Sequence, residues 1–160
     1  MRMLRRVPAF AAVLMVLAIG VAGSAAFQPS TASTVAVLHS TMTGAREVGH
    51  VGDLDAKGSS IVFLNAANGQ VCYLLRATGL SQPPTAAHIH IGDAGTAGPV
   101  VIPLPLTGGH GVYSGCIHAD KTLVQSIIDN PGGFYTNIHT SDFPAGAIRG
   151  QLSPIAPAQG

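Results

Sequence analysis

The sequence has no tryptophan, only two cysteines and few charged residues. Charged side chains make up 9% of the 160 residues, and eight Lys and Arg against seven Asp and Glu leave a formal net charge of +1. This balance is unlike that of a polybasic nucleic-acid-binding protein or an acidic disordered chain. Two cysteines are also too few for a cysteine-only zinc finger or ribbon. We therefore expect no nucleic-acid partner.

Glycine and proline are abundant, by contrast. The chain has 20 Gly and 11 Pro, and only 5% of its residues are aromatic. So many turn-forming residues favour short strands joined by turns over long helices. The length is that of about one domain.

The N-terminal segment has the three-part pattern of a secretory signal. Three arginines among the first six residues precede an apolar run at 9–22 and small residues at 23–26. We predict a signal peptide over 1–26 with cleavage after Ala26. The alternative is an uncleaved anchor, but the apolar run is shorter than the roughly 20 residues that span a bilayer. We expect a secreted or cell-envelope protein with no stable membrane span after cleavage.

Export to an oxidising compartment would allow the two cysteines to form a disulfide. Cys72 and Cys116 are the only pair, and both lie in apolar segments that resemble strands. Disulfides persist outside the reducing cytoplasm, so we predict a bridge between them. The chain-entropy account gives such a bridge a stabilisation of about 4 kcal/mol. The alternative is two buried free thiols.

The rest of the chain reads as one domain over 34–153, after a linker at 27–33 and before a flexible Pro/Ala tail at 154–160. Short apolar or alternating segments bounded by turn residues predict strands at 34–39, 58–64, 71–77, 85–91, 100–106, 111–117, 134–139 and 147–152. Asn68-Gly69 is a strong hairpin signal between two of them. We predict an all-β fold, an antiparallel Greek-key-like β-sandwich.

One segment departs from this pattern. Residues 120–130 carry apolar side chains at 123, 124, 127 and 128, which is helical spacing. Asp120 is a suitable N-cap, and Asn130 followed by Pro and Gly ends the segment. We predict a short crossover helix between two strands.

The densest group of polar side chains contains histidines in two predicted strands. Because side chains alternate along a strand, His88 and His90 share one face, and Tyr135, Asn137 and His139 share a face of a later strand. If the two strands are neighbours, His88, His90 and His139 converge. Three neutral imidazoles suit copper or zinc and leave a coordination position open. The alternative is a half-solvated strand whose histidines bind nothing.

No catalytic set is recognisable in the sequence. It has no Gly-x-Ser-x-Gly elbow, no paired carboxylates typical of a glycosidase, and no phosphate-binding loop. We therefore expect a protein that is not an enzyme.

Three motifs together resemble the CHRD domain, named after chordin. They are the segments 87–101 (AHIHIGDAGTAGPVV) and 134–152 (FYTNIHTSDFPAGAIRGQL), and a Gly-x-x-Glu-Val turn at 44–48. The resemblance spans about residues 34–153. It implies a secreted all-β domain with no generally established catalytic activity. The growth-factor antagonism of chordin depends on separate cysteine-rich modules, which this chain has no room for, so that function is not carried over.

The chain departs from the family pattern at two places. Ala147 stands where the family usually has glutamate, and Gly49-His50 follow Val48 where the family usually has two prolines. Arg149 is retained, and we expect Glu47 and Arg149 to be structural polar residues, with Arg149 pairing with a loop carbonyl or with a carboxylate such as Glu47 or Asp142.

Two functions follow from these observations. The first is an exported, non-catalytic binding or structural module with an unidentified extracellular or envelope partner. The alternative is a copper- or zinc-binding protein that uses His88, His90 and His139. A metalloenzyme similar to Cu/Zn superoxide dismutase is a weaker version of the second, because the further histidines and bridging ligand of that family are not found at the required spacings.

Overall fold

The computed structural model describes residues 33–155. The predicted signal peptide, the linker up to residue 32 and the last five residues of the tail lie outside the described residues. The strands are β1 (Val35–Thr43), β2 (Lys57–Asn65), β3 (Gln70–Thr78), β4 (Pro84–Ile91), β5 (Val100–Pro103), β6 (Gly108–Gly109), β7 (Val112–His118), β8 (Phe134–Thr140), β9 (Ile148–Gln151) and β10 (Ser153–Pro154). The helices are α1 (Lys121–Asp129) and the short 3-10 turns η1 (Gly44–Arg46), η2 (Val48–His50) and η3 (Pro131–Gly133).

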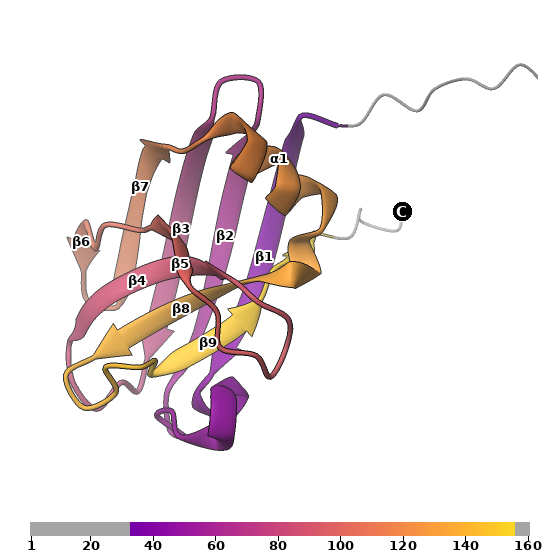
Figure 1. Ribbon diagram of the computed structural model, residues 1–160. Coiled ribbons are helices and arrows are strands. Elements are labelled where there is room, and N and C mark those ends of the chain that lie inside the picture. Colours follow the sequence, from indigo (N-terminus) through magenta and orange to yellow (C-terminus); the bar gives the residue numbers. More distant parts are fainter. Residues whose placement is uncertain (1–32, 156–160) are drawn as a thin grey trace, which may run out of the picture. The chain divides into compact units, whose positions relative to one another are not determined.

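The strands form one antiparallel sheet in the order β5-β4-β8-β9-β1-β2-β3-β7-β6, with β10 paired to β1. The sheet curls so that β4, β8 and β9 pass across β1, β2 and β3 (Figure 1). The predicted all-β fold with one short helix is confirmed, and the two layers expected of a sandwich belong to one continuous sheet. We call β1, β2, β3, β7 and β6 the hairpin half, and β5, β4, β8 and β9 the histidine half.

The hairpin half consists of long strands in unbroken register. β1 pairs with β2 along its whole length, and so does β2 with β3. The loop at 66–69 joins β2 to β3, where Gly69 has φ +76° and the Asn68 side chain accepts a hydrogen bond from the backbone N–H of Gln70. The predicted hairpin is therefore present. Cys72 lies directly opposite Cys116 on β7, and the predicted disulfide between them is confirmed.

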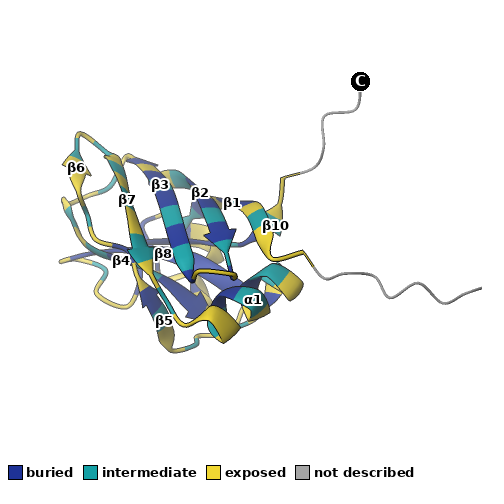
Figure 2. Cartoon of the chain, turned by 90° about the horizontal axis from the view of Figure 1, so that it is seen from above, coloured by how far each residue is buried: buried dark blue, intermediate teal, exposed yellow. Residues whose placement is uncertain are grey.

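The core lies between the two halves. Figure 2 shows buried and half-buried residues alternating along β2 and β3, as expected of strands with one face inward. Both halves contribute fully buried aliphatic side chains: Leu64, Leu75, Ile89, Ile138 and Ile148. A short chain of buried hydroxyls also crosses the core. Ser60 on β2 contacts Ser40 on β1 at 2.9 Å and Thr136 on β8 at 3.0 Å.

The helix α1 connects the two halves at one end of the sheet. The Asp120 carboxylate accepts hydrogen bonds from two backbone N–H groups of the first turn, which is the predicted N-cap. Val124 and Ile127 on its apolar face are buried. The predicted crossover helix between β7 and β8 is thus confirmed. No helix within residues 33–155 has the length and apolar character needed to cross a membrane.

Two strands end more than one residue away from the expected position. The first strand continues to Thr43 rather than ending at residue 39, because the Ser40 hydroxyl is hydrogen-bonded inside the core. The strand expected at 100–106 ends at Pro103, since Pro103 and Pro105 have no N–H to donate to a neighbouring strand.

Candidate functional site

Polar side chains line one face of the histidine half. Because residues directly opposite each other in an antiparallel pair share a face, the register of β4 with β8 and of β8 with β9 places seven of them together. We call this set the polar layer: His88, His90, Tyr135, Asn137, His139, Arg149 and Gln151. The opposite face of the same strands carries Ile89, Ile138 and Ile148, which belong to the core.

Loops cover the polar layer, and hydrogen bonds hold them there. The Arg149 guanidinium donates to the carbonyl oxygens of Thr96 and Asp93 in the loop after β4. The Gln151 amide donates to the carbonyl of Gly92 in the same loop. As a result every residue of β8 is buried, although its two faces have opposite polarity.

The structure brings together the three histidines that the sequence singled out. One ring nitrogen from each of His88, His90 and His139 can be chosen so that all three lie within 4.8 Å of one another. Nδ1 of His88 is 3.1 Å from Nε2 of His139. This trio is the one group of three or more potential metal ligands in the part of the chain that the structure describes.

Backbone carbonyls set the tautomers of two of these rings. Nδ1 of His90 contacts the carbonyl of Gly98 at 2.9 Å, and Nδ1 of His139 contacts the carbonyl of Pro144 at 3.1 Å. A carbonyl can only accept, so each Nδ1 carries the proton and each Nε2 keeps a lone pair. In His90 that Nε2 is buried and has no hydrogen-bond partner. A free lone pair on an oriented imidazole is the arrangement that metal-binding histidines share.

Burial keeps the three rings neutral. Burial, together with the nearby His139 and His90, lowers the pKa of His88 to about 4. Burial likewise lowers the pKa values of His90 and His139, despite the hydrogen bonds to backbone carbonyls, which act in the opposite direction. Neutral imidazole is the form that binds metal, so no proton has to be displaced at neutral pH.

An aromatic stack extends from the histidines to Arg149. The His90 ring stacks on Tyr135 with centroids 4.8 Å apart and planes 10° from parallel. The guanidinium carbon of Arg149 lies 3.5 Å from the centroid of the same Tyr135 ring. One face of the ring cannot hold both groups at these distances, so they lie on opposite faces. The second contact is a cation–π interaction.

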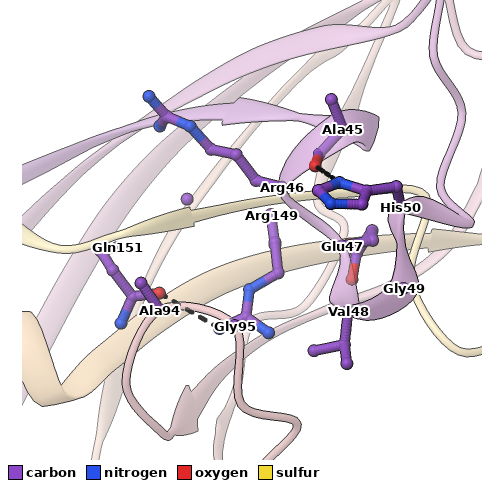
Figure 3. A pocket seen from close by; sticks show the side chains of 11 residues that line it. Ala45, Arg46, Glu47, Val48, Gly49, His50, Ala94, Gly95, Arg149 and Gln151 are labelled. Atoms are coloured by element: carbon purple, nitrogen blue, oxygen red, sulfur yellow. Dashed lines mark hydrogen bonds between the residues drawn. The ribbon is translucent and has the colours of Figure 1, made fainter.

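A pocket of about 640 Å³ lies at the other end of this stack. It is formed by η1 and η2, the loop after β4, and β9 (Figure 3). Arg149 and Glu47 lie next to each other in it, between Gln151 on one side and His50 on the other. Glu47 is only 6% exposed, and its Oε1 has no hydrogen-bond partner.

Burial decides the protonation of Glu47. It raises the pKa of the carboxyl from 4.5 to about 7, although the positive charge of Arg149 and the side chain of Asn137 both favour the ionised form. Gly146 makes this burial possible. A Cβ there would lie 2.6 Å from Oε1 of Glu47 and 2.7 Å from Nδ2 of Asn137, and the backbone has φ +143°.

The two residues expected to have structural polar roles, Glu47 and Arg149, are therefore neighbours. Arg149 is 2% exposed and donates to loop carbonyls, but no ion pair joins it to a carboxylate within residues 33–155. Ala147, where the family usually has glutamate, is fully buried next to this pair, and its backbone carbonyl accepts from the N–H of Asp53.

The sequence-based reasoning did not foresee the parts played by Tyr135, Asn137 and Gln151. Their alternation with His139 and Arg149 along two strands was the available signal. Among the described residues, only three buried side-chain atoms lack a partner, and all belong to the polar layer or to Glu47 beside it: His90 Nε2, Asn137 Oδ1 and Glu47 Oε1.

The chain matches the CHRD domain over residues 38–152. No curated protein and no solved structure gives a significant match.

Proposed function

Because the chain belongs to the CHRD domain family, we propose that it is an exported, non-catalytic binding module that holds one copper or zinc ion through His88, His90 and His139. The family supports a binding or structural module in general terms. The observation that carries the metal proposal is the Nε2 lone pair of His90, which is buried, oriented and unpartnered.

The geometry needs little adjustment to accept an ion. Metal–nitrogen bonds of about 2.0–2.1 Å in a tetrahedral site place the ligand atoms about 3.3 Å apart. One pair of ring nitrogens is already 3.1 Å apart, and the three lie within 4.8 Å. Small side-chain rotations suffice, together with a shift of the His88 proton from Nδ1, which here donates to Nε2 of His139, to the other ring nitrogen. The three imidazoles leave one position open for water or for a donor group from a partner molecule.

Copper and zinc are the metals of choice for a set of imidazoles alone. Hard cations such as calcium and magnesium prefer oxygen ligands, and no carboxylate belongs to this group of described residues. The buried position protects the imidazoles from protons, so binding persists to mildly acidic pH.

Elemental analysis tests the proposal. The protein is purified without chelators or metal-affinity resin, loaded with Cu²⁺ or Zn²⁺, and desalted. We expect about one metal ion per chain, and loss of that ion in His88→Gln and in His139→Gln. The matched control is His118→Gln, because His118 is an exposed histidine on β7 outside the cluster. Absence of bound metal in the parent protein, or full affinity in both cluster variants, would overturn the proposal.

Export has its own test. We expect the mature protein, recovered from the medium or the cell envelope, to begin at Phe27, as determined by intact mass and N-terminal sequencing. Full-length protein retained in the membrane would show instead that residues 1–26 serve as an anchor.

A further inference from the structure

We propose that the pocket between η1–η2 and β9 is a second binding site, which takes a small organic carboxylate with an apolar body. It lies beyond the stack formed by His90, Tyr135 and Arg149 and shares no residue with the histidine cluster. Its volume of about 640 Å³ is in the range of small-molecule sites.

The positive charge of the pocket favours an anion. Arg149 is part of its lining. Three of its five guanidinium N–H groups donate hydrogen bonds, to the carbonyls of Thr96 and Asp93 and to the side-chain oxygen of Gln151. The remaining two have no partner within residues 33–155. Arg46 also lines the pocket, but its guanidinium donates to the carbonyl of Thr41 and points away from Arg149 (Figure 3). A cationic ligand would be repelled by Arg149.

Glu47 supplies a hydrogen-bonding group that fits a carboxylate. Glu47 lines the pocket, and its Oε1 is buried against Gly146 and unpartnered. In the protonated state the Glu47 carboxyl can donate a hydrogen bond to a ligand oxygen, while Arg149 neutralises the ligand charge. The apolar part of the ligand would lie against Val48 and the small residues Ala45 and Ala94, which also line the pocket.

Carboxylate binding should then depend on the protonation of Glu47. The charged and titratable groups around it are Arg149 from β9 and, from its own segment, Arg46 and His50. Asn137 from β8 is neutral, and the Asp53 carboxylate is engaged elsewhere, by the N–H of Ser81. The Glu47 carboxyl has a pKa of about 7. The fraction of protein molecules with a protonated Glu47, which is the form that binds the ligand, therefore falls about tenfold between pH 6 and pH 8.

The probe is benzoate, compared with its neutral and cationic counterparts benzamide and benzylamine. Binding to the purified protein is followed by calorimetry and by NMR shifts of residues 44–50. We expect benzoate to bind about tenfold more tightly at pH 6 than at pH 8, and more tightly than either counterpart. Equal or tighter binding of benzylamine, or no binding of benzoate, would overturn the proposal.

Four variants test the position of the site and the group that takes up the proton. Glu47→Gln keeps a neutral side chain, so we expect benzoate affinity to become independent of pH; a retained pH dependence would contradict the role of Glu47. Val48→Glu puts a carboxylate in the lining of the pocket and should abolish benzoate binding. Val51→Glu is the matched control, because Val51 is 64% exposed and outside the lining. Equal binding by the two glutamate variants would contradict the assigned site. His50→Asn should leave the pH dependence unchanged.

The two proposals can fail separately. His88→Gln is expected to lose the metal and keep benzoate binding, whereas Val48→Glu is expected to lose benzoate and keep the metal. Loss of benzoate binding in folded, metal-free His88→Gln protein would contradict an independent carboxylate site.

Discussion

In the hairpin half of the sheet, β1, β2 and β3 follow one another in sequence and pair along nine residues each, and a disulfide ties β3 to β7. In the histidine half, β4 and β8 are separated by more than forty residues, and β8 is followed by the short strand β9. The first half buries hydrocarbon and hydroxyl groups on its inner face. The second also buries two histidines, an arginine and an amide on the face that loops cover.

The two halves also differ in their buried polar groups that lack a hydrogen-bond partner. Each buried polar atom without a hydrogen bond costs about 1–3 kcal/mol. The three such atoms among residues 33–155 all lie on or against the histidine half. The hairpin half, with its continuous register and covalent link, supplies stability that offsets this cost.

Removal of the disulfide should weaken the hairpin half most. We expect the double variant Cys72→Ala/Cys116→Ala to lose about 4 kcal/mol of unfolding free energy, because the bridge closes a long loop in the unfolded chain. Denaturant titration of oxidised parent and variant measures the loss. Metal binding below the unfolding transition should persist, since the bridge does not touch the polar layer. An unchanged transition midpoint would contradict the stabilising role given to this half.

The protonation of Glu47 should make the histidine half sensitive to pH. The pKa of its carboxyl is about 7 in the folded protein and near 4.5 when unfolded, so the folded state holds the proton more tightly. This contribution to stability is fully present below pH 4.5 and is lost as the pH rises through 7. From pH 5 to pH 8, Glu47→Gln should therefore gain on the order of 2–3 kcal/mol relative to the parent. A stability difference that stays constant across this range would refute the assignment.

The buried hydroxyl chain tests the contact between the halves. Ser60→Ala leaves the hydroxyls of Ser40 and Thr136 without their shared partner. We expect a loss of about 1–2 kcal/mol in unfolding free energy, measured by denaturant titration. The triple variant Ser40→Ala/Ser60→Ala/Thr136→Val should recover most of it, because no hydroxyl is then orphaned. Ser114→Ala, on the exposed side of β7, is the control. A triple variant less stable than Ser60→Ala would show that the hydroxyls stabilise the contact themselves.

Features with a local cause could be predicted from the sequence. The β2–β3 hairpin follows from Asn68-Gly69, and the helix from its apolar spacing and the Asp120 cap. The shared face of His88 and His90 follows from strand geometry alone. Their convergence with His139 required β4 and β8 to be neighbours, which the sequence analysis could state only as a condition. The register now meets that condition.

Features that depend on loop placement could not be predicted. The unpartnered Nε2 of His90 exists because the loop after β4 folds back and offers the carbonyl of Gly98. The burial of Glu47 requires η1 and η2 to pack against Gly146, about a hundred residues later in the chain. No periodicity in the sequence reports such contacts between distant segments.

The central position of β1 has a consequence for the order in which the molecule folds. β1 can pair with β2 as soon as the first hairpin is made, but its contact with β9 joins Thr43 to Arg149. Contacts between residues so far apart close a long loop and form slowly. Arg149 and Gln151 reach Asn137 and Tyr135 through the local pairing of β9 with β8, but the pocket between η1–η2 and β9 does not exist until the long loop closes. We therefore expect this pocket to be among the last parts of the domain to become ordered during folding, and the hairpins of β1, β2 and β3 among the first.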